Sequence, residues 1–384
     1  MTRREVAIVG VAESDLGVTN LSKLELLTQG VTRALDDAGL GLSDVEGLAV
    51  NDLGRFPPVQ VAEYLGIQPR WTDSSFTGGS SWVRYVGQAA DAIAAGHIDT
   101  ALVAYGSDQR SAARRTIGGV VEADTHKPQF QNPYHPLNPI SMYAMAAQRH
   151  MHEFGTTAAD LAEIAVAARA WALLNPKAYR HEAGPLTVAD VLASRPISTP
   201  LKAADCCLVT DGGGAVVLTT AERARDLTDT PVLVLGHGEC TTHDSMAAMP
   251  DLTWTGAARS GARAFEMAGL TPADVDVLQL YDSFTITVAL TLEALGFCER
   301  GAFPTLVRDG RIAPGGDLPL NTSGGGLSYC HPGQLGLLLV VEAVRQLRGE
   351  ADARQVPGGP EVAVVHGTGG ILSTHTTALL GRDR

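Results

Sequence analysis

The chain has 384 residues, of which 45% are hydrophobic and 18% are charged, and its formal net charge at pH 7 is −13. This apolar composition supports sizeable buried cores and excludes a globally disordered chain. The acidic excess argues against a general nucleic-acid or membrane-surface binder, because both need a basic face. Frequent glycine (42 residues) and scarce aromatic residues (5%) favour an α/β protein with tight turns between strands and helices.

The cysteines and the N-terminal residues bear on the compartment. The five cysteines include no C-x-x-C pair, which disfavours zinc or dithiol redox chemistry and favours a reduced compartment. The first residues lack the apolar core and the cleavage site of a signal peptide. No apolar run reaches the roughly 18 residues of a membrane span. We therefore expect a cytoplasmic protein that binds no metal, no membrane and no nucleic acid.

Short apolar runs, taken in chain order, predict buried strands, and the amphipathic stretches between them predict helices. The predicted strands are 6–11, 45–50, 101–105, 215–218, 232–235, 275–281 and 362–366. The predicted helices are 23–38, 82–95, 158–174, 256–268 and 334–347. This alternation indicates helices that cover mainly parallel sheets.

Two parts of the chain share an order of elements that indicates a duplicated α/β unit. In each, a helix ends in a Gly-Leu pair (39–40 and 269–270) and leads to a strand. A glycine-rich segment, 78–81 or 324–326, then precedes a helix and a strand that ends in glycine. We therefore predict an N-terminal half, residues 1–230, and a C-terminal half, residues 231–384; coincidence among common βαβ parts is the alternative.

Residues from about 118 to 200 interrupt the first half. This insertion begins with several prolines and with histidines and tyrosines such as His126 and Tyr143. A long insertion of this kind is typical of a lid or binding loop, and the alternative is a solvated excursion with a local core. Arg110, Arg114 and Arg115 form the only dense group of cations near it, and they are either part of a site for the CoA phosphates or solvated surface.

Six segments, in this order and spacing, resemble the thiolase superfamily and, within it, the non-specific lipid-transfer-protein thiolase-like branch. They are 6–14, 78–108, 205–218, 274–285, 321–336 and 362–381. The resemblance covers nearly the whole chain. It implies a thiolase-like α/β fold, with duplicated halves in a layered αβαβα arrangement, and a homodimer.

The departures from the thiolase pattern concern both of the family's cysteines. Gly79 stands where the resemblance places the nucleophilic cysteine, and His366 stands where it places the second one. A thiolate at a helix N-terminus can accept an acyl group, whereas glycine cannot. Ser80 and Cys330 are the other candidate nucleophiles, but no base is evident beside Ser80.

Three residues are candidates for acid–base and oxyanion chemistry. His331 matches the HPxGxxG histidine of the family, which implies that it holds the thioester oxygen; a capping or core histidine is the alternative. Tyr281 ends a predicted strand, and Tyr329 lies two residues before His331. A phenol can exchange a proton in a suitable pocket, although a buried tyrosine is more often a packing residue. The resemblance to bacterial steroid side-chain aldolases implies that both tyrosines are catalytic.

Four further residues are expected to line the substrate site. The family pattern places His366 there, and Gly367 and Gly369 would let backbone amides approach the thioester. Asp282 either orients a neighbouring group or caps the helix that follows Tyr281.

These residues predict an enzyme that forms a thioester enolate but transfers no acyl group. The favoured reaction is retro-aldol cleavage of a β-hydroxyacyl-CoA to a ketone and a short acyl-CoA, and the resemblance implies that the acyl group is a steroid side chain. CoA belongs to the substrate, and no other cofactor is expected. A condensing acyltransferase and a non-catalytic acyl-CoA or lipid-binding subunit are the alternatives. The resemblance also implies a partner protein with an OB fold and a zinc ribbon.

Overall fold

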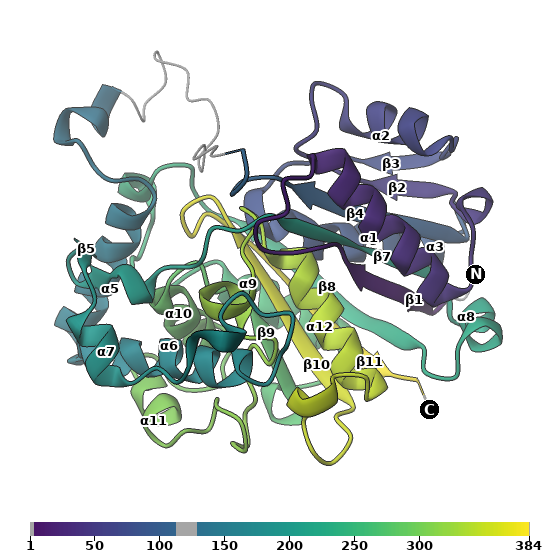
Figure 1. Cartoon of the computed structure of the whole chain (residues 1–384). Helices are drawn as coiled ribbons and strands as arrows, with labels where there is room; N and C mark the ends of the chain where they lie inside the picture. Colours follow the sequence, from purple (N-terminus) through teal and green to yellow (C-terminus); the bar gives the residue numbers. More distant parts are fainter. Residues whose placement is uncertain (1–3, 113–128, 384) are drawn as a thin grey trace.

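The computed structural model describes residues 4–112 and 129–383 of the chain (Figure 1). Arg114, Arg115 and His126, singled out above, lie outside these residues. None of the described helices is both long enough and apolar enough to cross a lipid bilayer.

Nine strands form one mixed sheet in the described part of the chain, and five of them belong to the N-terminal half. These are β1 (Val6–Glu13), β2 (Gly47–Ala49), β3 (Trp71–Asp73), β4 (Thr100–Ser107) and β7 (Gly212–Thr220). They lie in the order β3-β2-β4-β7-β1. β2 is parallel to β3 and β4, whereas the β4–β7 and β7–β1 pairs are antiparallel.

The C-terminal half repeats this arrangement. Its strands are β8 (Val232–Thr241), β9 (Val277–Leu280), β10 (Val362–Gly369) and β11 (Thr374–Arg382). Their order, β9-β10-β11-β8, and their directions match β2-β4-β7-β1. A parallel bridge from Leu278 to Leu320 takes the place of the β2–β3 pair, and two residue pairs between β1 and β8 join the halves. The topology confirms the duplicated unit, and the boundary predicted at 230/231 falls between β7 and β8.

The expectation of mainly parallel sheets is wrong. In the described sheet only the β2–β3, β2–β4 and β9–β10 pairs are parallel. The reason lies in the connections, because β11 follows β10 through the turn 370–373, which is too short for a crossover helix. Two consecutive strands joined in this way must run antiparallel.

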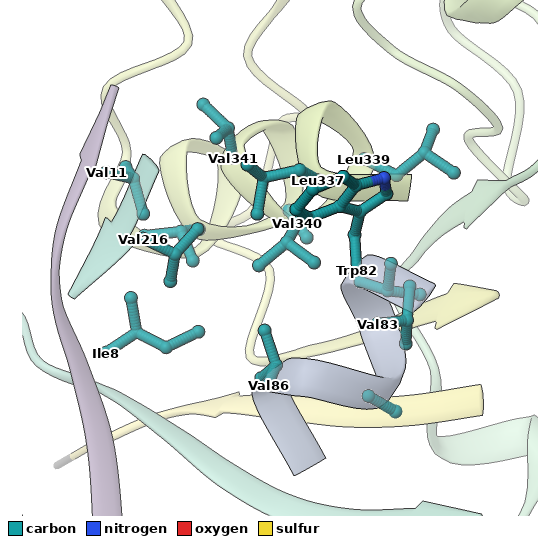
Figure 2. Close-up of a cluster of buried hydrophobic side chains, with 14 of the residues drawn as sticks. Ile8, Val11, Trp82, Val83, Val86, Val216, Leu337, Leu339, Val340 and Val341 are labelled. Atoms are coloured by element: carbon teal, nitrogen blue, oxygen red, sulfur yellow. The ribbon is translucent and has the colours of Figure 1, made fainter. Parts of the chain in front are cut away.

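Helices form three layers around the two parts of the sheet. On the outside, α1 (Lys23–Ala38) contacts β1, β4 and β7, and α9 (Ala257–Ala268) contacts β8 and β11. Between them, α3 (Ser81–Ala94) and α12 (Gly336–Arg348) contact each other and strands of both halves. Figure 2 shows Trp82 of α3 and Leu337 of α12 in one apolar cluster with Ile8 and Val216. The predicted αβαβα arrangement is thus confirmed.

The insertion between β4 and β7 packs on the C-terminal half. It contains α5 (Ile140–Phe154), α6 (Ala158–Ala172), α7 (Val188–Ala193), β5 (Pro196–Ser198) and β6 (Leu201–Lys202). The other α-helices in the described residues are α2 (Pro57–Leu65), α8 (Ala221–Leu227), α10 (Thr285–Ala294) and α11 (Phe303–Arg308). One apolar core joins the insertion to α10 and α11, and within it the fully buried His150 and Glu293 lie 3.1 Å apart. The insertion is therefore a packed part of the fold.

Candidate active site

Tyr281 and His331 form a buried hydrogen-bonded pair. Tyr281 directly follows β9, and the Tyr281 hydroxyl lies 3.0 Å from Nε2 of His331. The Leu335 backbone N–H donates to the same hydroxyl oxygen at 3.3 Å, and the two rings meet edge to face. Both side chains are about 95% buried, with exposures of 4% and 5%. The structure therefore brings together two of the three predicted catalytic side chains.

Burial keeps both members of this pair uncharged at neutral pH. It raises the pKa of Tyr281 well above the usual value and lowers the pKa of His331 to about 4. In one arrangement His331 Nε2–H donates to the phenol oxygen, which leaves the phenol proton free for a substrate. In the other arrangement the phenol donates to an unprotonated Nε2. A pair with both arrangements can give a proton to a substrate and take one from it.

The ring of Tyr281 occupies the space where a side chain on residue 79 would lie. A Cβ atom at Gly79 would come within 2.3 Å of Tyr281 Cε2 and 2.5 Å of Cζ. It would also lie 2.6 Å from the backbone oxygen of Thr368. Residue 79 must therefore be glycine while Tyr281 keeps this position. The phenol takes the place that the resemblance assigns to a nucleophilic cysteine.

Asp282 anchors the backbone that leads to Tyr329 and His331. Its carboxylate is fully buried and accepts the N–H groups of Gly326 at 2.6 Å and Leu327 at 3.1 Å. These residues belong to a π-helix, Gly325–Tyr329, a form that is frequent at functional sites. Asp282 thus holds the backbone of the site and makes no cap on α10, whose N-cap is Phe284; its contact with substrate stays a prediction.

The pKa of Asp282 predicts a pH-dependent rate. Burial raises this pKa from 3.8 to about 6, against the hydrogen bonds from Gly326 and Leu327, which lower it. Protonation removes one acceptor from the π-helix, so kcat/KM should rise as pH increases through about 6. Because the pKa is raised on folding, the same group makes the fold less stable as pH rises from 3.8 through 6.

Rate and thermal stability, measured from pH 5 to 8, should therefore move in opposite directions through this window. Asp282→Asn should flatten the acid limb and reduce kcat/KM by about tenfold, since one backbone N–H then faces an amide N–H₂. A wild-type rate that is constant across this range would contradict the assignment.

The Tyr329 phenol is buried near the charges of Glu13 and Arg345. Tyr329 ends the π-helix and is 4% exposed, within the central apolar cluster. Burial raises the pKa of Tyr329 well above the usual value, and Glu13 adds to this effect while Arg345 opposes it. Among the described residues no hydrogen bond links its hydroxyl to Tyr281 or His331. Its catalytic role stays a prediction.

His366 is locked inside the sheet. Its Nδ1 lies 2.9 Å from the Thr377 hydroxyl, and its Nε2 lies 3.2 Å from Nδ1 of His375. His375 Nε2 lies 3.1 Å from the Leu372 carbonyl oxygen, which can only accept a hydrogen bond, so the proton of His375 is on Nε2. Nδ1 of His375 is then an acceptor, and His366 Nε2–H donates to it. Both ring nitrogens of His366 are thus engaged, and its contact with substrate stays a prediction.

Gly367 and Gly369 pack against the chain's own glycine-rich loop. A Cβ atom at Gly367 would lie 2.9 Å from the Cα atom of Ser80, and one at Gly369 would lie 1.7 Å from the Thr77 carbonyl oxygen. Their lack of a side chain lets β10 approach residues 77–80. A backbone contact with the thioester stays a prediction.

The two alternative nucleophiles lack activating partners. The Ser80 hydroxyl donates to the Thr77 carbonyl at 2.7 Å and also lies 2.8 Å from the Thr374 hydroxyl, so no base adjoins it. The Cys330 thiol is fully buried 3.1 Å from the Thr210 hydroxyl. Burial raises the pKa of Cys330 to about 12, which leaves almost no thiolate at neutral pH.

A cationic cavity of about 560 Å³ opens beside the site. Arginines from four separate parts of the sequence line it: Arg110, Arg169, Arg180 and Arg195. Burial lowers the pKa of Arg169, and the nearby Arg180 charge lowers it further, as expected for two unneutralised cations. None of the four forms an ion pair with an acidic residue that the structure describes. The cavity thus presents cationic groups that could receive an anion.

Cys207 connects this cavity with the tyrosine–histidine pair. It lines the cavity, and its backbone N–H donates to the Ser283 carbonyl at 2.9 Å. It also lies close enough to Tyr281 to influence the pKa of the phenol. Of its lining arginines the sequence singled out only Arg110, because the other three are spread along the insertion and meet it only through the fold.

The chain is similar to thiolase-fold enzymes of two reaction types. The family model described as "Thiolase C-terminal domain-like" matches residues 238–382. The chain is 36% identical to a 17-hydroxy-3-oxo-4-pregnene-20-carboxyl-CoA lyase of Mycobacterium tuberculosis, over 96% of this chain and 98% of the lyase. It is 33% identical to an acetyl-CoA acetyltransferase of Methanothermobacter thermautotrophicus, over 97% and 99% of the two chains.

A solved structure shares the whole fold. It is described as "Ltp2-ChsH2(DUF35) aldolase", and it superposes with a TM-score of 0.91 at 33% identity, over 100% of this chain and 99% of the other. The duplicated topology, the matching family model and these full-length relatives agree. The chain belongs to the thiolase superfamily, in which its full-length relatives include a steroid side-chain-cleaving aldolase.

Proposed function

We propose that this chain cleaves the Cα–Cβ bond of a β-hydroxyacyl-CoA, with an acyl group of steroid size, to a ketone and a shortened acyl-CoA. One observation carries the proposal: the Tyr281 phenol fills the space at Gly79 and bonds to His331 at 3.0 Å. An acid–base pair thus stands where acyl transfer would need a nucleophile. The lyase and the aldolase among the relatives support the same reaction.

The chemistry requires one proton to leave the substrate and one to return. The β-hydroxyl proton passes to the Tyr281 oxygen as the phenol proton passes to His331 Nε2. The Cα–Cβ bond then breaks, the β-carbon becomes a carbonyl, and the electron pair forms the enolate of the thioester. A proton returned to the α-carbon, from the same pair or from Tyr329, completes the short acyl-CoA. A buried site favours this sequence because it excludes competing water.

The cationic cavity suits the phosphates of CoA, with the pantetheine arm reaching Tyr281 past Cys207. Replacing Arg180 or Arg195 with glutamine should raise KM for an acyl-CoA by about three- to thirtyfold, because a charge-assisted hydrogen bond is lost. The increase should shrink at high salt and vanish with an acyl-pantetheine, which has no nucleotide phosphates. Arg225→Gln, which removes an exposed partner of Asp383, is the control. Equal effects on both thioesters would exclude a phosphate site.

Acyl transfer is the second candidate, because an acetyl-CoA acetyltransferase is a full-length relative. The purified protein is incubated with a β-hydroxyacyl-CoA of steroid size, and the ketone and the short acyl-CoA are followed by mass spectrometry. Cleavage that Cys330→Ser retains supports the aldolase. An acyl adduct on the protein with no ketone would replace it with a transferase, and bound but unchanged substrate would indicate a binding subunit.

The assembly belongs to the same proposal. We expect a homodimer in the cytoplasm, together with a partner subunit that carries an OB fold and a zinc ribbon. The two-component description of the similar aldolase supports a partner. Since the chain has its own cationic cavity, the partner is expected to shield the acyl group rather than to supply the phosphate site. Assays with and without the partner test this, and full activity of the chain alone would reject it.

A further inference from the structure

Tyr143 connects the insertion to both sides of the active site. It lies in the first turn of α5, and it is 3% exposed. Its ring packs against Phe284, three residues after Tyr281, with centroids 4.5 Å apart. Its hydroxyl donates to the backbone oxygen of Gly370 at 3.3 Å. It also lies close enough to Tyr281 to influence the pKa of that phenol.

The turn that accepts this hydrogen bond is fixed by other donors. His243 Nε2 lies 3.0 Å from the Ile371 carbonyl, and His375 Nε2 lies 3.1 Å from the Leu372 carbonyl. Both imidazoles therefore donate to the turn. The other face of the turn meets the glycine-rich loop, because a Cβ atom at Gly78 would lie 2.9 Å from the Gly370 nitrogen. The turn is thus held by two histidines and by the glycine-rich loop, and Tyr143 attaches α5 to it.

The insertion has a separate anchor on the CoA side. The backbone N–H groups of Tyr179 and Arg180 donate to the carbonyls of Tyr329 and Ser328 at 2.9 and 3.1 Å. These bonds hold the rim of the cationic cavity on the π-helix. Tyr143 holds another part of the insertion, against Phe284 and the Gly370 carbonyl, and it lies near both Tyr281 and Cys207. The two anchors share no residue, so one can be weakened without the other.

We infer that Tyr143 is a positioning residue: it holds α5 in place at the part of the site where the acyl group binds, so that α5 forms a wall against that group. This inference rests on the proposed acyl-CoA substrate, because CoA in the cationic cavity directs the acyl group toward Phe284 and Tyr143. A bulky acyl group packs against this wall. A short acyl group ends before it. Tyr143 therefore sets the preference for acyl size without taking part in the proton transfers.

The test compares binding of two thioesters that cannot be cleaved because they lack a β-hydroxyl group: butyryl-CoA and a steroid-carboxyl-CoA. Calorimetry with Tyr143→Phe should show binding of the steroid thioester weakened by about three- to tenfold, as expected for one lost hydrogen bond. Binding of butyryl-CoA should be unchanged. Tyr143→Leu, which also removes the ring, should widen the difference. Tyr85→Phe, which removes a buried hydroxyl bonded to the Ser75 carbonyl at 2.8 Å, is the matched control.

Equal weakening of both thioesters, or no change in either, would overturn the inference. So would tighter binding of the steroid thioester by Tyr143→Phe. Because these measurements need no cleavage, they separate this inference from the proposed reaction. If the protein binds both thioesters with the expected difference and cleaves no β-hydroxyacyl-CoA, the aldolase proposal fails and the role of Tyr143 stands.

Discussion

Tyr281→Phe should reduce kcat for carbon–carbon cleavage by about 10²–10⁴-fold and leave the fold intact, as is typical when an acid–base group is lost. The change keeps the ring that fills the space at Gly79 and removes only the hydroxyl bonded to His331 and Leu335. The loss should appear in kcat more than in KM, because the proton moves only during the reaction. Rates of ketone release, with circular dichroism and thermal melts, check this.

The control for this change is again Tyr85→Phe, whose lost hydroxyl lies in the N-terminal half and should leave kcat unaffected. Tyr329→Phe separates two mechanisms. A comparable loss of rate would make Tyr329 the second acid, as the resemblance implies. A rate near that of the wild type would assign both proton steps to the Tyr281–His331 pair. A Tyr281→Phe variant with normal cleavage would contradict the whole scheme.

Gly79→Ala should lower cleavage by at least about 10²-fold, because a displaced acid–base group loses its alignment. The new methyl group would lie 2.3 Å from Tyr281 Cε2 and 2.6 Å from the Thr368 carbonyl oxygen, so the phenol must leave its position. Overpacking of this kind typically costs about 1–3 kcal/mol of stability. Rates and denaturant melts of the variant measure both effects.

Gly41→Ala is the matched control, because its Cβ atom would have ordinary contacts at 3.7 and 3.8 Å and Gly41 has a negative φ. A second variant, Gly79→Ala with Tyr281→Ala, removes the clash with the ring but keeps the one with the Thr368 carbonyl and leaves a cavity, so it should recover none of the activity. Normal cleavage rates in the Gly79→Ala variant would show that Tyr281 does not need the space at residue 79 for the reaction.

Local patterns in the sequence predicted the framework of the fold. Residues 23–38 were expected to form a helix, and α1 is Lys23–Ala38, because Ser22 and Glu25 form a capping box and Gly39 ends the helix in a left-handed conformation. The expected strand 362–366 is the first part of β10. The apolar run before Tyr281 likewise placed this residue at a strand end. These features depend on neighbours in sequence, which a pattern records.

The features that the sequence did not predict depend on contacts between residues that are distant along the chain. Strand β11 begins with four polar residues, Thr374 to Thr377, so its sequence lacks the apolar run that predicts a buried strand. Its pairing with β10 and β8 makes it a strand. The π-helix exists because Asp282 holds backbone groups more than 40 positions away. The cationic cavity and the reach of Tyr143 arise only when the insertion folds onto the C-terminal half.

The contact between residue 79 and the Tyr281 ring makes the two positions depend on each other in evolution. A cysteine at position 79 is incompatible with the phenol where it now lies, and the phenol is incompatible with a cysteine already in place. Neither substitution is neutral on the background of the other. A lineage that exchanges acyl transfer for carbon–carbon cleavage must therefore change both positions together, or pass through a sequence with a small residue at each. Such an intermediate has neither nucleophile nor phenol, so on that route an inactive form separates the two chemistries and no bifunctional one joins them.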